Sequence, residues 1–271
     1  MTLSNIVVSL DLGDAAADRV RLAAALAERF GATLTGVAAR EILAPMLADD
    51  TLAIERIFEE EERLAREQIA EAGTLFERAA GAAPRTDWQS ALAPPLSVLV
   101  ERARGADLVV VGRQGPADGD PGLLAVPSGA LLMAVGRPVL VAPPGLARLS
   151  GKRIVVAWKD TREARRAVHD ALPFLTRAER AFVVAVGPDA RHEGAEGTAA
   201  YLVGHGCEAT THLLPRPTLG PADALLRFAE REGADLIVMG AYGHTRLREW
   251  IFGGVTRAML RTTSICCLMS H

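Results

Sequence analysis

The sequence has few cysteines: three in 271 residues, Cys207, Cys266 and Cys267. They are too few and too poorly spaced for a disulfide framework or a Cys-x-x-Cys zinc site. Cys266 and Cys267 are adjacent in an apolar run that predicts a strand, so their side chains should point to opposite faces. We therefore expect buried thiols that act as small hydrophobic groups, and we assign no metal site.

Aromatic residues and net charge are also low, at 4% and −3. So little stacking surface, without an excess of positive charge, argues against a nucleic-acid partner. No apolar run approaches the roughly 20 residues that a membrane helix needs. The segment Met1–Leu10 lacks the basic start and long apolar stretch of a secretory leader. We therefore expect a cytoplasmic protein with no membrane partner.

Several catalytic motifs are missing as well. The chain has no Gly-x-Ser-x-Gly elbow and no Gly-x4-Gly-Lys-Ser/Thr loop, which argues against a serine hydrolase or a P-loop ATPase. Its six histidines include no pair at i, i+4 with an intervening glutamate. We assign no catalytic residue. His244 stands apart from the other histidines, because it directly follows Gly243 in a glycine-rich segment and could face a phosphate.

What the chain does contain is an internal repeat. The apolar runs at 6–11 and 154–159 are each followed by a polar turn and an alanine-rich helical pattern. Order and spacing agree in both halves, which indicates two copies of one fold. The further matching pairs are 106–112 with 234–240, and 138–141 with 265–268.

The turn-rich segment around Pro143-Pro144-Gly145 predicts a boundary, and we place two domains at 1–148 and 149–271. Nearly continuous apolar strands that alternate with helices predict a parallel, doubly wound α/β sheet in each. In the second half we expect strands at 153–158, 181–186, 208–214, 235–239 and 265–269, and helices at 162–176, 196–204, 221–232 and 254–262.

Two expectations concern the surfaces of these sheets. The final strands, 139–142 and 266–269, are too apolar to be left as open edges, so we expect them to pack against each other as an intramolecular pseudo-dimer. The first half has a longer helical segment at 54–80, and its glutamate run at 59–62 should be a solvated helix face.

The clearest chemical motif follows the fourth strand of the second half. It reads Gly240-x2-Gly243-x9-Gly253-Gly254-Val255-Thr256, with a helix beginning near Gly254. Glycines permit close backbone approach and positive φ, so that successive N–H groups can converge on an anion. The start of the helix directs its free N–H groups and positive dipole end to the same place. Thr256 adds either a hydroxyl donor or a helix-start cap.

This motif resembles that of the universal stress protein family, and the likeness extends over essentially the whole chain. It implies two tandem flavodoxin-like (Rossmann-like) domains, each with a five-stranded parallel sheet. The implied ligand is ATP, or AMP or ADP, with Mg²⁺ accompanying ATP. By position, Gly240, Gly243, Gly253, Gly254, Val255 and Thr256 would surround the ribose and phosphates, and the segment 183–187, with Val186, would form the adenine wall.

The chain departs from the family at the end of the first strand of the second half. Lys159 stands where the family places an aspartate that contacts the adenosine moiety, and Asp160 comes one residue later. An ammonium group cannot accept a hydrogen bond as a carboxylate does. Lys159 could instead pair with a phosphate or extend into solvent.

The first half shows the opposite departure. It keeps Asp11 at the strand end, but Ala125, Val126 and Pro127 replace Gly253, Gly254 and Val255. Proline offers no N–H group, and a β-branched valine hinders close backbone approach. We therefore expect a structural first domain whose nucleotide loop has degenerated.

The resemblance implies a stress-response module that binds an adenine nucleotide in its second half and is not an enzyme. Two alternatives stay open: an ATP-hydrolysing or ATP-transferring enzyme of the same superfamily, and an interaction scaffold that binds no ligand. The protein partner is unknown, and a further homodimer is compatible with the sequence.

Overall fold

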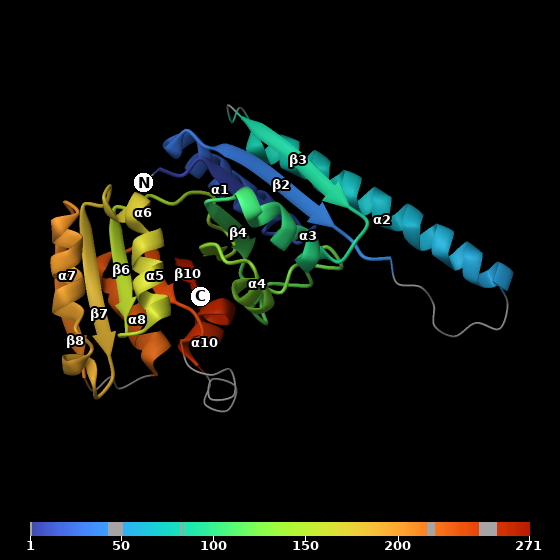
Figure 1. Ribbon diagram of the computed structural model, residues 1–271. Coiled ribbons are helices and arrows are strands. Elements are labelled where there is room, and N and C mark those ends of the chain that lie inside the picture. Colours follow the sequence, from blue (N-terminus) through green and yellow to red (C-terminus); the bar gives the residue numbers. More distant parts are fainter. Residues whose placement is uncertain (1, 43–50, 82, 84, 216–219, 244–253) are drawn as a thin grey trace.

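The computed structural model describes residues 2–42, 51–81, 83, 85–215, 220–243 and 254–271. The first half alternates strands and helices along the chain (Figure 1). Its elements are β1 (Asn5–Ser9), α1 (Ala16–Phe30), β2 (Thr33–Ala39), α2 (Thr51–Ala80), β3 (Thr86–Ala91), α3 (Pro95–Arg102), η1 (Ala103–Gly105), β4 (Leu108–Gly112), α4 (Ser128–Ala134) and β5 (Val139–Ala142).

The second half repeats this alternation, and its strands lie within one residue of those predicted. Its elements are β6 (Arg153–Trp158), α5 (Arg162–Asp170), α6 (Leu172–Leu175), β7 (Arg180–Val186), η2 (Ala190–His192), α7 (Ala195–Gly204), β8 (Ala209–Leu214), α8 (Pro221–Glu232), β9 (Leu236–Gly240), α10 (Val255–Thr262) and β10 (Cys266–Ser270). One helix differs from the prediction. The helix expected at 162–176 is interrupted at Ala171, and Pro173 lies in the first turn of α6, where its missing N–H group costs no hydrogen bond.

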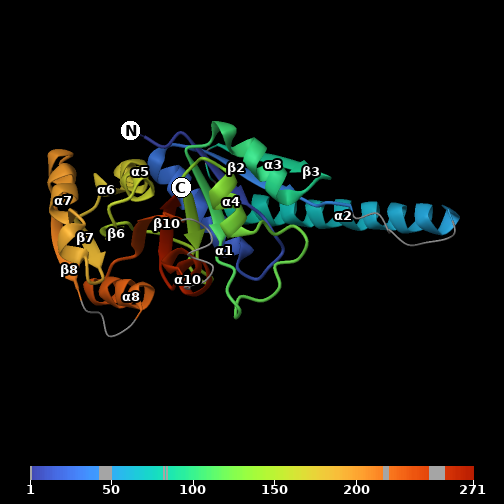
Figure 2. The same ribbon diagram turned by 60° about the horizontal axis from the view of Figure 1, so that its bottom comes forward.

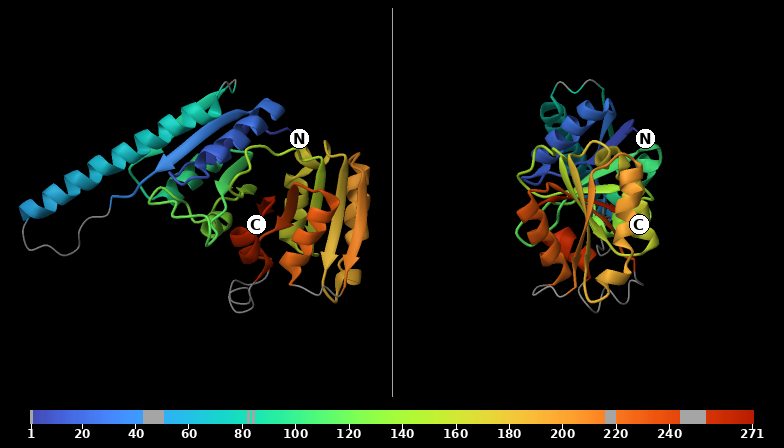
Figure 3. Two further views of the ribbon diagram at one scale, coloured as in Figure 1. Left: turned by 180° about the vertical axis from the view of Figure 1, so that it is seen from behind. Right: turned by 90° about the vertical axis from the view of Figure 1, so that its left-hand side faces the viewer.

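The strands of both halves form one sheet in the order β3-β2-β1-β4-β5-β10-β9-β6-β7-β8. Figure 3 shows them following one another across the molecule. Each half has five parallel strands and the same internal order, with its first strand in the middle. The expected α/β fold is confirmed. The boundary expected at 148/149 lies between β5 and β6, in a connection within this continuous sheet.

The two halves meet where β5 and β10 pair antiparallel. Cys267 lies opposite Val141, Leu268 opposite Leu140, and Met269 opposite Val139. The predicted packing of the final strands is therefore confirmed. The pairing covers two edges that would otherwise present unpaired backbone groups beside wholly buried apolar side chains.

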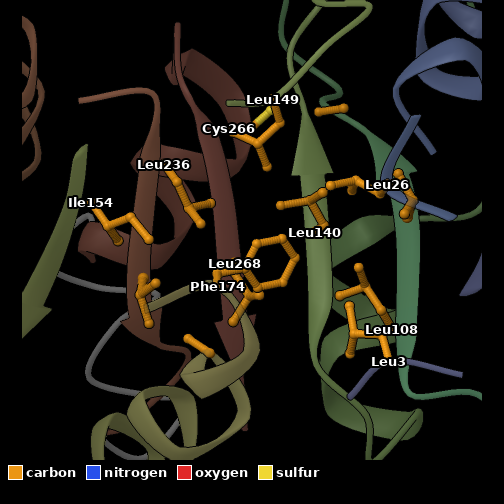
Figure 4. Close-up of a cluster of buried hydrophobic side chains, with 14 of the residues drawn as sticks. Leu3, Leu26, Leu108, Leu140, Leu149, Ile154, Phe174, Leu236, Cys266 and Leu268 are labelled. Carbon is orange, nitrogen blue, oxygen red and sulfur yellow. The ribbon is translucent and has the colours of Figure 1, made fainter. Parts of the chain in front are cut away.

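Alternating side chains build a separate apolar core on each face of the sheet. Leu140, Phe174, Cys266 and Leu268 belong to the core that lies under α1, α2, α5 and α7 (Figure 4). Cys267 belongs to the other core, which lies under α3, α4, α8 and α10. The adjacent cysteines thus face opposite sides, as predicted, and burial raises the pKa of the Cys266 thiol to about 12.

Helix α2 extends beyond the edge of the sheet (Figure 2). Its glutamate run is mainly a solvated face, as expected: Glu59 and Glu60 are exposed, and Glu60 pairs with Arg63. Glu61 differs, because it turns toward the buried Arg40 at the end of β2 and accepts a hydrogen bond from it at 2.7 Å. The described part of the chain contains no helix long and apolar enough to span a bilayer.

The junction of the two halves predicts a large stability effect at Leu268. Substituting Leu268→Ala should lower the free energy of unfolding by about 2–5 kcal/mol. The reason is that Leu268 and its cross-strand neighbour Leu140 are fully buried, so the lost side-chain atoms leave a cavity. Urea denaturation measures the change. Val203→Ala, on the exposed face of α7, is the control and should change it by less than about 0.5 kcal/mol. An effect at Leu268 no larger than the control's would contradict this role.

Candidate functional site

A cavity of about 390 Å³ opens at the carboxyl ends of β6, β7 and β9. Its volume lies in the range of about 300–1,000 Å³ that is typical of small-molecule sites. The predicted site residues Lys159, Val186, Gly240, Gly243, Gly254, Val255 and Thr256 all line it. The other lining residues are Ala157, Trp158, Thr161, Ala164, Val184, Pro221, Leu225 and Met239.

The strand order explains why the cavity forms here. Strand β6 pairs with β7 on one side and with β9 on the other, so the connections leaving β6 and β9 pass to opposite faces of the sheet. Ligands of open α/β sheets bind at this kind of switch point, outside the carboxyl ends of the strands. Residues that follow β6 consequently lie between Val186 at the end of β7 and Gly240 at the end of β9.

Much of the cavity wall is apolar. Val184, Leu225 and Met239 are buried, and Val186 is partly buried beside them. Trp158 also lines the cavity, while its Nε1–H donates to the Glu193 carbonyl at 2.6 Å. Trp158 is not among the predicted site residues, yet its position at the end of β6 makes it part of the cavity wall. Its place at the strand end was the signal that could have revealed this.

The start of α10 forms another part of the cavity wall. Gly254 is the N-cap residue, at φ −55° and ψ 151°, and no side chain among the described residues caps the helix. The first intrahelical hydrogen bond runs from Ala258 N–H to the Gly254 carbonyl, so the N–H groups of Val255 and Thr256 have no intrahelical acceptor. These donors and the positive end of the helix dipole favour an anion here.

The glycine turn differs in detail from the prediction. Gly240 and Gly243 do not adopt positive φ; Tyr242, between them, does, at φ 55°. Gly240 is needed for close packing, because a Cβ there would lie 2.5 Å from the backbone nitrogen of Ala164 in α5. The Tyr242 N–H donates to Thr256 Oγ1 at 3.2 Å, so this hydroxyl ties the turn to α10 and does not cap its own helix.

The polar groups after β6 separate into two environments. Lys159 is exposed and lines the cavity. Asp160, the carboxylate that follows Lys159, does not line it: its side chain pairs with Arg165, and its backbone N–H donates to Glu193 at 2.7 Å. The aspartate next to Lys159 therefore does not replace the missing carboxylate.

Glu163 is a buried carboxylate behind the glycine turn. Its Oε2 lies 3.3 Å from where a Cβ on Gly243 would be. Burial opposes ionisation of this group, but hydrogen bonds from Arg162 and from its own backbone outweigh that effect and hold the pKa of the Glu163 carboxyl below its usual value. Its charge is thus matched locally, and the residue does not line the cavity.

Two predicted site residues, His244 and Gly253, lie outside the described residues. Within the residues that the structure does describe, no group of three His, Cys, Asp or Glu side chains is arranged to hold a metal ion.

Comparison with known proteins establishes the family. The profile of the Universal stress protein family matches residues 2–143 and 218–271. The chain belongs to the universal stress protein family. A curated member, Universal stress protein Slr1230 from Synechocystis, is 44% identical over 43 residues, or 16% of this chain and 15% of that protein, so the match spans only a small part of either.

Solved structures agree over nearly the whole chain. A universal stress protein from Archaeoglobus fulgidus has a TM-score of 0.72 at 16% identity, covering 98% of this chain and 95% of its own. The functionally unknown protein PA1789 from Pseudomonas aeruginosa has a TM-score of 0.55 at 17% identity, covering 99% and 92%. At these identities the likeness shows the fold alone. Residues 144–217, which include Lys159 and Val186, lie outside the segments that the universal stress protein profile matches.

In the first half of this universal stress protein, the corresponding loop is filled by the chain's own side chains. Asp118 accepts hydrogen bonds from the Gly115 N–H at 2.6 Å and from Arg113 Nε at 2.8 Å. The Gln114 side chain donates to the Val126 carbonyl at 3.0 Å, and its Oε1 lies 3.4 Å from the N–H of Ser128, the first residue of α4. An internal carboxylate and an internal amide thus hold donors that a phosphate would use.

The first-half aspartate is also engaged. Asp11 is buried and pairs with Arg19 at 2.8 Å, while its other oxygen accepts the Gly13 N–H at 3.1 Å. Its lone pairs therefore serve the fold of the β1–α1 connection.

The filled loop predicts a pH-dependent contribution from Asp118. Arg113 and, more weakly, the Gly115 N–H hold the pKa of the Asp118 carboxyl below its usual value, although burial opposes this. A lowered folded-state pKa stabilises the protein above the unfolded value of about 3.9, and this stabilisation is lost as the pH falls through the folded value. Asp118→Asn should therefore lower the free energy of unfolding by about 1–3 kcal/mol at pH 7 and by less near pH 3.

Urea denaturation of the parent and Asp118→Asn at both pH values measures this difference. Asp120→Asn, a nearby variant without a described ion pair, serves as the control. A cost for Asp118→Asn that is the same at both pH values would show that charge is not what holds the loop.

Proposed function

We propose that the second half binds an adenine nucleotide, ATP or else AMP or ADP, as a non-enzymatic stress-response module. The observation that carries the proposal is the cavity itself, which combines apolar side chains, Val184 and Val186 of β7 among them, with uncapped backbone donors at α10. A nucleotide has the same division, with a flat, largely apolar base at one end and anionic phosphates at the other.

The orientation follows from that match. The phosphates lie against Gly254, Val255 and Thr256, where free N–H groups and the helix dipole favour negative charge. The adenine lies near Val184, Val186 and Leu225, and the ribose lies at the end of β6. His244 and Gly253 belong to the loop beside the phosphates by sequence position.

The proposal assigns no catalysis. Among the described lining residues there is no carboxylate to act as a general base or to hold Mg²⁺. Among the described lining residues, Thr161 and Thr256 carry the side-chain oxygens, and with the phosphates themselves they would be the ligands of a magnesium ion that accompanies ATP. The first half is a structural domain in this proposal, because Asp118 and Gln114 hold its loop closed.

The alternative is an interaction scaffold that binds no ligand. It is supported by Lys159, which stands where the family places an aspartate, and it predicts that no adenine nucleotide binds.

The first prediction of this proposal is one nucleotide per chain. Replacing Gly253→Ala, Gly254→Val and Val255→Pro copies the first-half sequence into the second, adding bulk and removing one N–H donor. Loss of one hydrogen bond to a charged group lowers affinity about tenfold to a hundredfold before any steric clash is counted. Binding should become undetectable by equilibrium dialysis with labelled ATP.

The fold should survive the triple change, because Gly254 has φ −55°, which valine also adopts, and proline is favoured at the first helical position. Circular dichroism checks this. Gly240→Ala would be a poor test, since it collides with α5 whether or not a ligand binds. Two sites per parent chain would contradict the prediction of one nucleotide. Full binding by a folded triple variant would show that the site is not where we propose it.

The second prediction concerns Lys159. Lys159→Asp introduces a carboxylate that can accept hydrogen bonds from ribose hydroxyls, and should tighten ATP binding about three- to tenfold. Calorimetry compares the two proteins at one salt concentration. Unchanged or weaker affinity would mean that Lys159 is itself a ligand of ATP or does not contribute.

A further inference from the structure

Strand β8 forms the edge of the sheet in the second half. It pairs with β7 on one side, and among the described residues no strand lies on its other side. The right-hand view of Figure 3 faces this end of the sheet. The six residues of β8 are Ala-Thr-Thr-His-Leu-Leu, and all except Thr210 are partly buried. An edge of this kind presents backbone groups that can pair with another chain.

The register with β7 determines which backbone groups point outward. The Ala181 N–H donates to the Glu208 carbonyl at 2.7 Å, so the carbonyl of Glu208 points toward β7. Backbone direction alternates along a strand, so every second residue from Glu208 onward also turns its N–H and C=O groups toward β7. The N–H and C=O groups of Ala209, Thr211 and Leu213 therefore point away from the sheet.

Nothing in the sequence of β8 prevents these groups from pairing. Natural edge strands are protected by charged side chains, by proline or by a bulge. β8 contains no Asp, Glu, Lys, Arg or Pro, and its register with β7 is unbroken. His212 packs beside the rings of Phe182 and Phe228, and burial holds the pKa of His212 below its usual value. The strand is therefore neutral at pH 7 and unprotected.

The outward groups of β8 are complementary to those of a second β8. A two-fold axis through Thr211, perpendicular to the sheet, sets two such strands antiparallel. Thr211 then lies opposite Thr211 of the second copy, and Ala209 lies opposite Leu213 of the second copy. These positions are hydrogen-bonded pairs of an antiparallel ladder, in which the two residues exchange both N–H···O bonds. Every outward donor of both strands thus obtains an acceptor.

The side chains fit the same pairing. Thr211 meets its own copy, and threonine pairs across strands are favourable. On the other face of the sheet, Thr210 lies opposite His212 of the second copy. Glu208, which precedes the strand, lies opposite Leu214, so no like charges meet. The register that satisfies the backbone therefore introduces no repulsion.

From these observations we infer that β8 is a dimer interface and that its occupant is a second copy of this chain, paired antiparallel about Thr211. The molecule already uses this arrangement once, because β5 and β10 join its two halves antiparallel. The edge at β3 is a poorer candidate, since it carries the carboxylate of Asp87 within the strand. The inference goes beyond the proposed function and does not depend on it, because no residue of β8 lines the cavity.

Sedimentation of the full chain without nucleotide, over a range of concentrations, tests the inference. The parent should form a dimer with twice the 28.7 kDa mass of the chain. Thr211→Lys should weaken the dimer about tenfold or more, because the two-fold axis sets two like charges directly opposite each other. Thr211 is partly exposed, so a lysine there can reach solvent in the monomer and the fold should survive.

Two variants serve as controls. Ser90→Lys adds the same charge to an exposed position of β3, the strand at the other end of the sheet, and should leave the dimer unchanged. Thr211→Val keeps a β-branched side chain and the outward backbone groups, so it should retain the dimer. Circular dichroism confirms that each variant is folded.

A cysteine variant tests the register. Two-fold pairing about Thr211 brings position 211 of both chains within reach of a disulfide. Oxidised Thr211→Cys should therefore run as a covalent dimer on a non-reducing gel. Thr210→Cys should not, because this register places a different residue opposite it. The natural cysteines, Cys207, Cys266 and Cys267, are buried.

Each contrary result overturns the inference. A parent that stays monomeric at every concentration shows that β8 recruits no second copy. A dimer that Thr211→Lys leaves intact forms through another surface, and dissociation by Ser90→Lys assigns the contact to β3. Covalent dimers of Thr210→Cys without those of Thr211→Cys show a different register. None of these results bears on nucleotide binding, so the proposed function stands or falls separately.

Discussion

The antiparallel pairing of β5 with β10 is the contact on which the rest of this structure depends. Every other neighbouring pair in the sheet is parallel and lies within one half. A parallel sheet with helices on both faces buries its strands completely, so its last strand cannot face water without exposing an apolar edge. Pairing the two last strands covers the apolar edge of both halves at once, and each of the two apolar cores extends through both halves.

The halves share a topology but differ at the carboxyl ends of their strands. In the first half, Asp118 and Gln114 hold the donors of the loop after β4, and Arg19 neutralises Asp11. In the second half, the start of α10 has no side-chain cap among the described residues and borders a cavity. The difference comes from a few side chains. The backbone arrangement of a flavodoxin-like sheet provides the site, and local side chains determine whether the protein fills it itself.

Much of this could be predicted from the sequence, because apolar periodicity and the repeat are strong signals. The strand positions, the pairing of the last strands and the opposite orientations of Cys266 and Cys267 were all predictable on that basis. The positive φ at Tyr242 was not, because its cause is tertiary: the residue is held by Thr256, fourteen positions later. The orientation of Asp160 was equally hidden, because two tertiary contacts determine it. Its side chain pairs with Arg165, and its backbone N–H donates to the Glu193 side chain.

The closed first-half loop and the open second-half cavity are also in physical contact through α10. Arg113, which holds Asp118 in the first-half loop, also donates to the carbonyl of Thr263 at 2.7 Å. Thr263 is the C-cap residue of α10, whose opposite end borders the cavity. A second contact reaches the glycine turn, because Gly129 of α4 packs so closely against Tyr242 that a Cβ would lie 2.7 Å from its hydroxyl. The first half therefore supports both the helix and the turn that shape the second-half cavity, which gives its side-chain-filled loop a structural role even without a ligand.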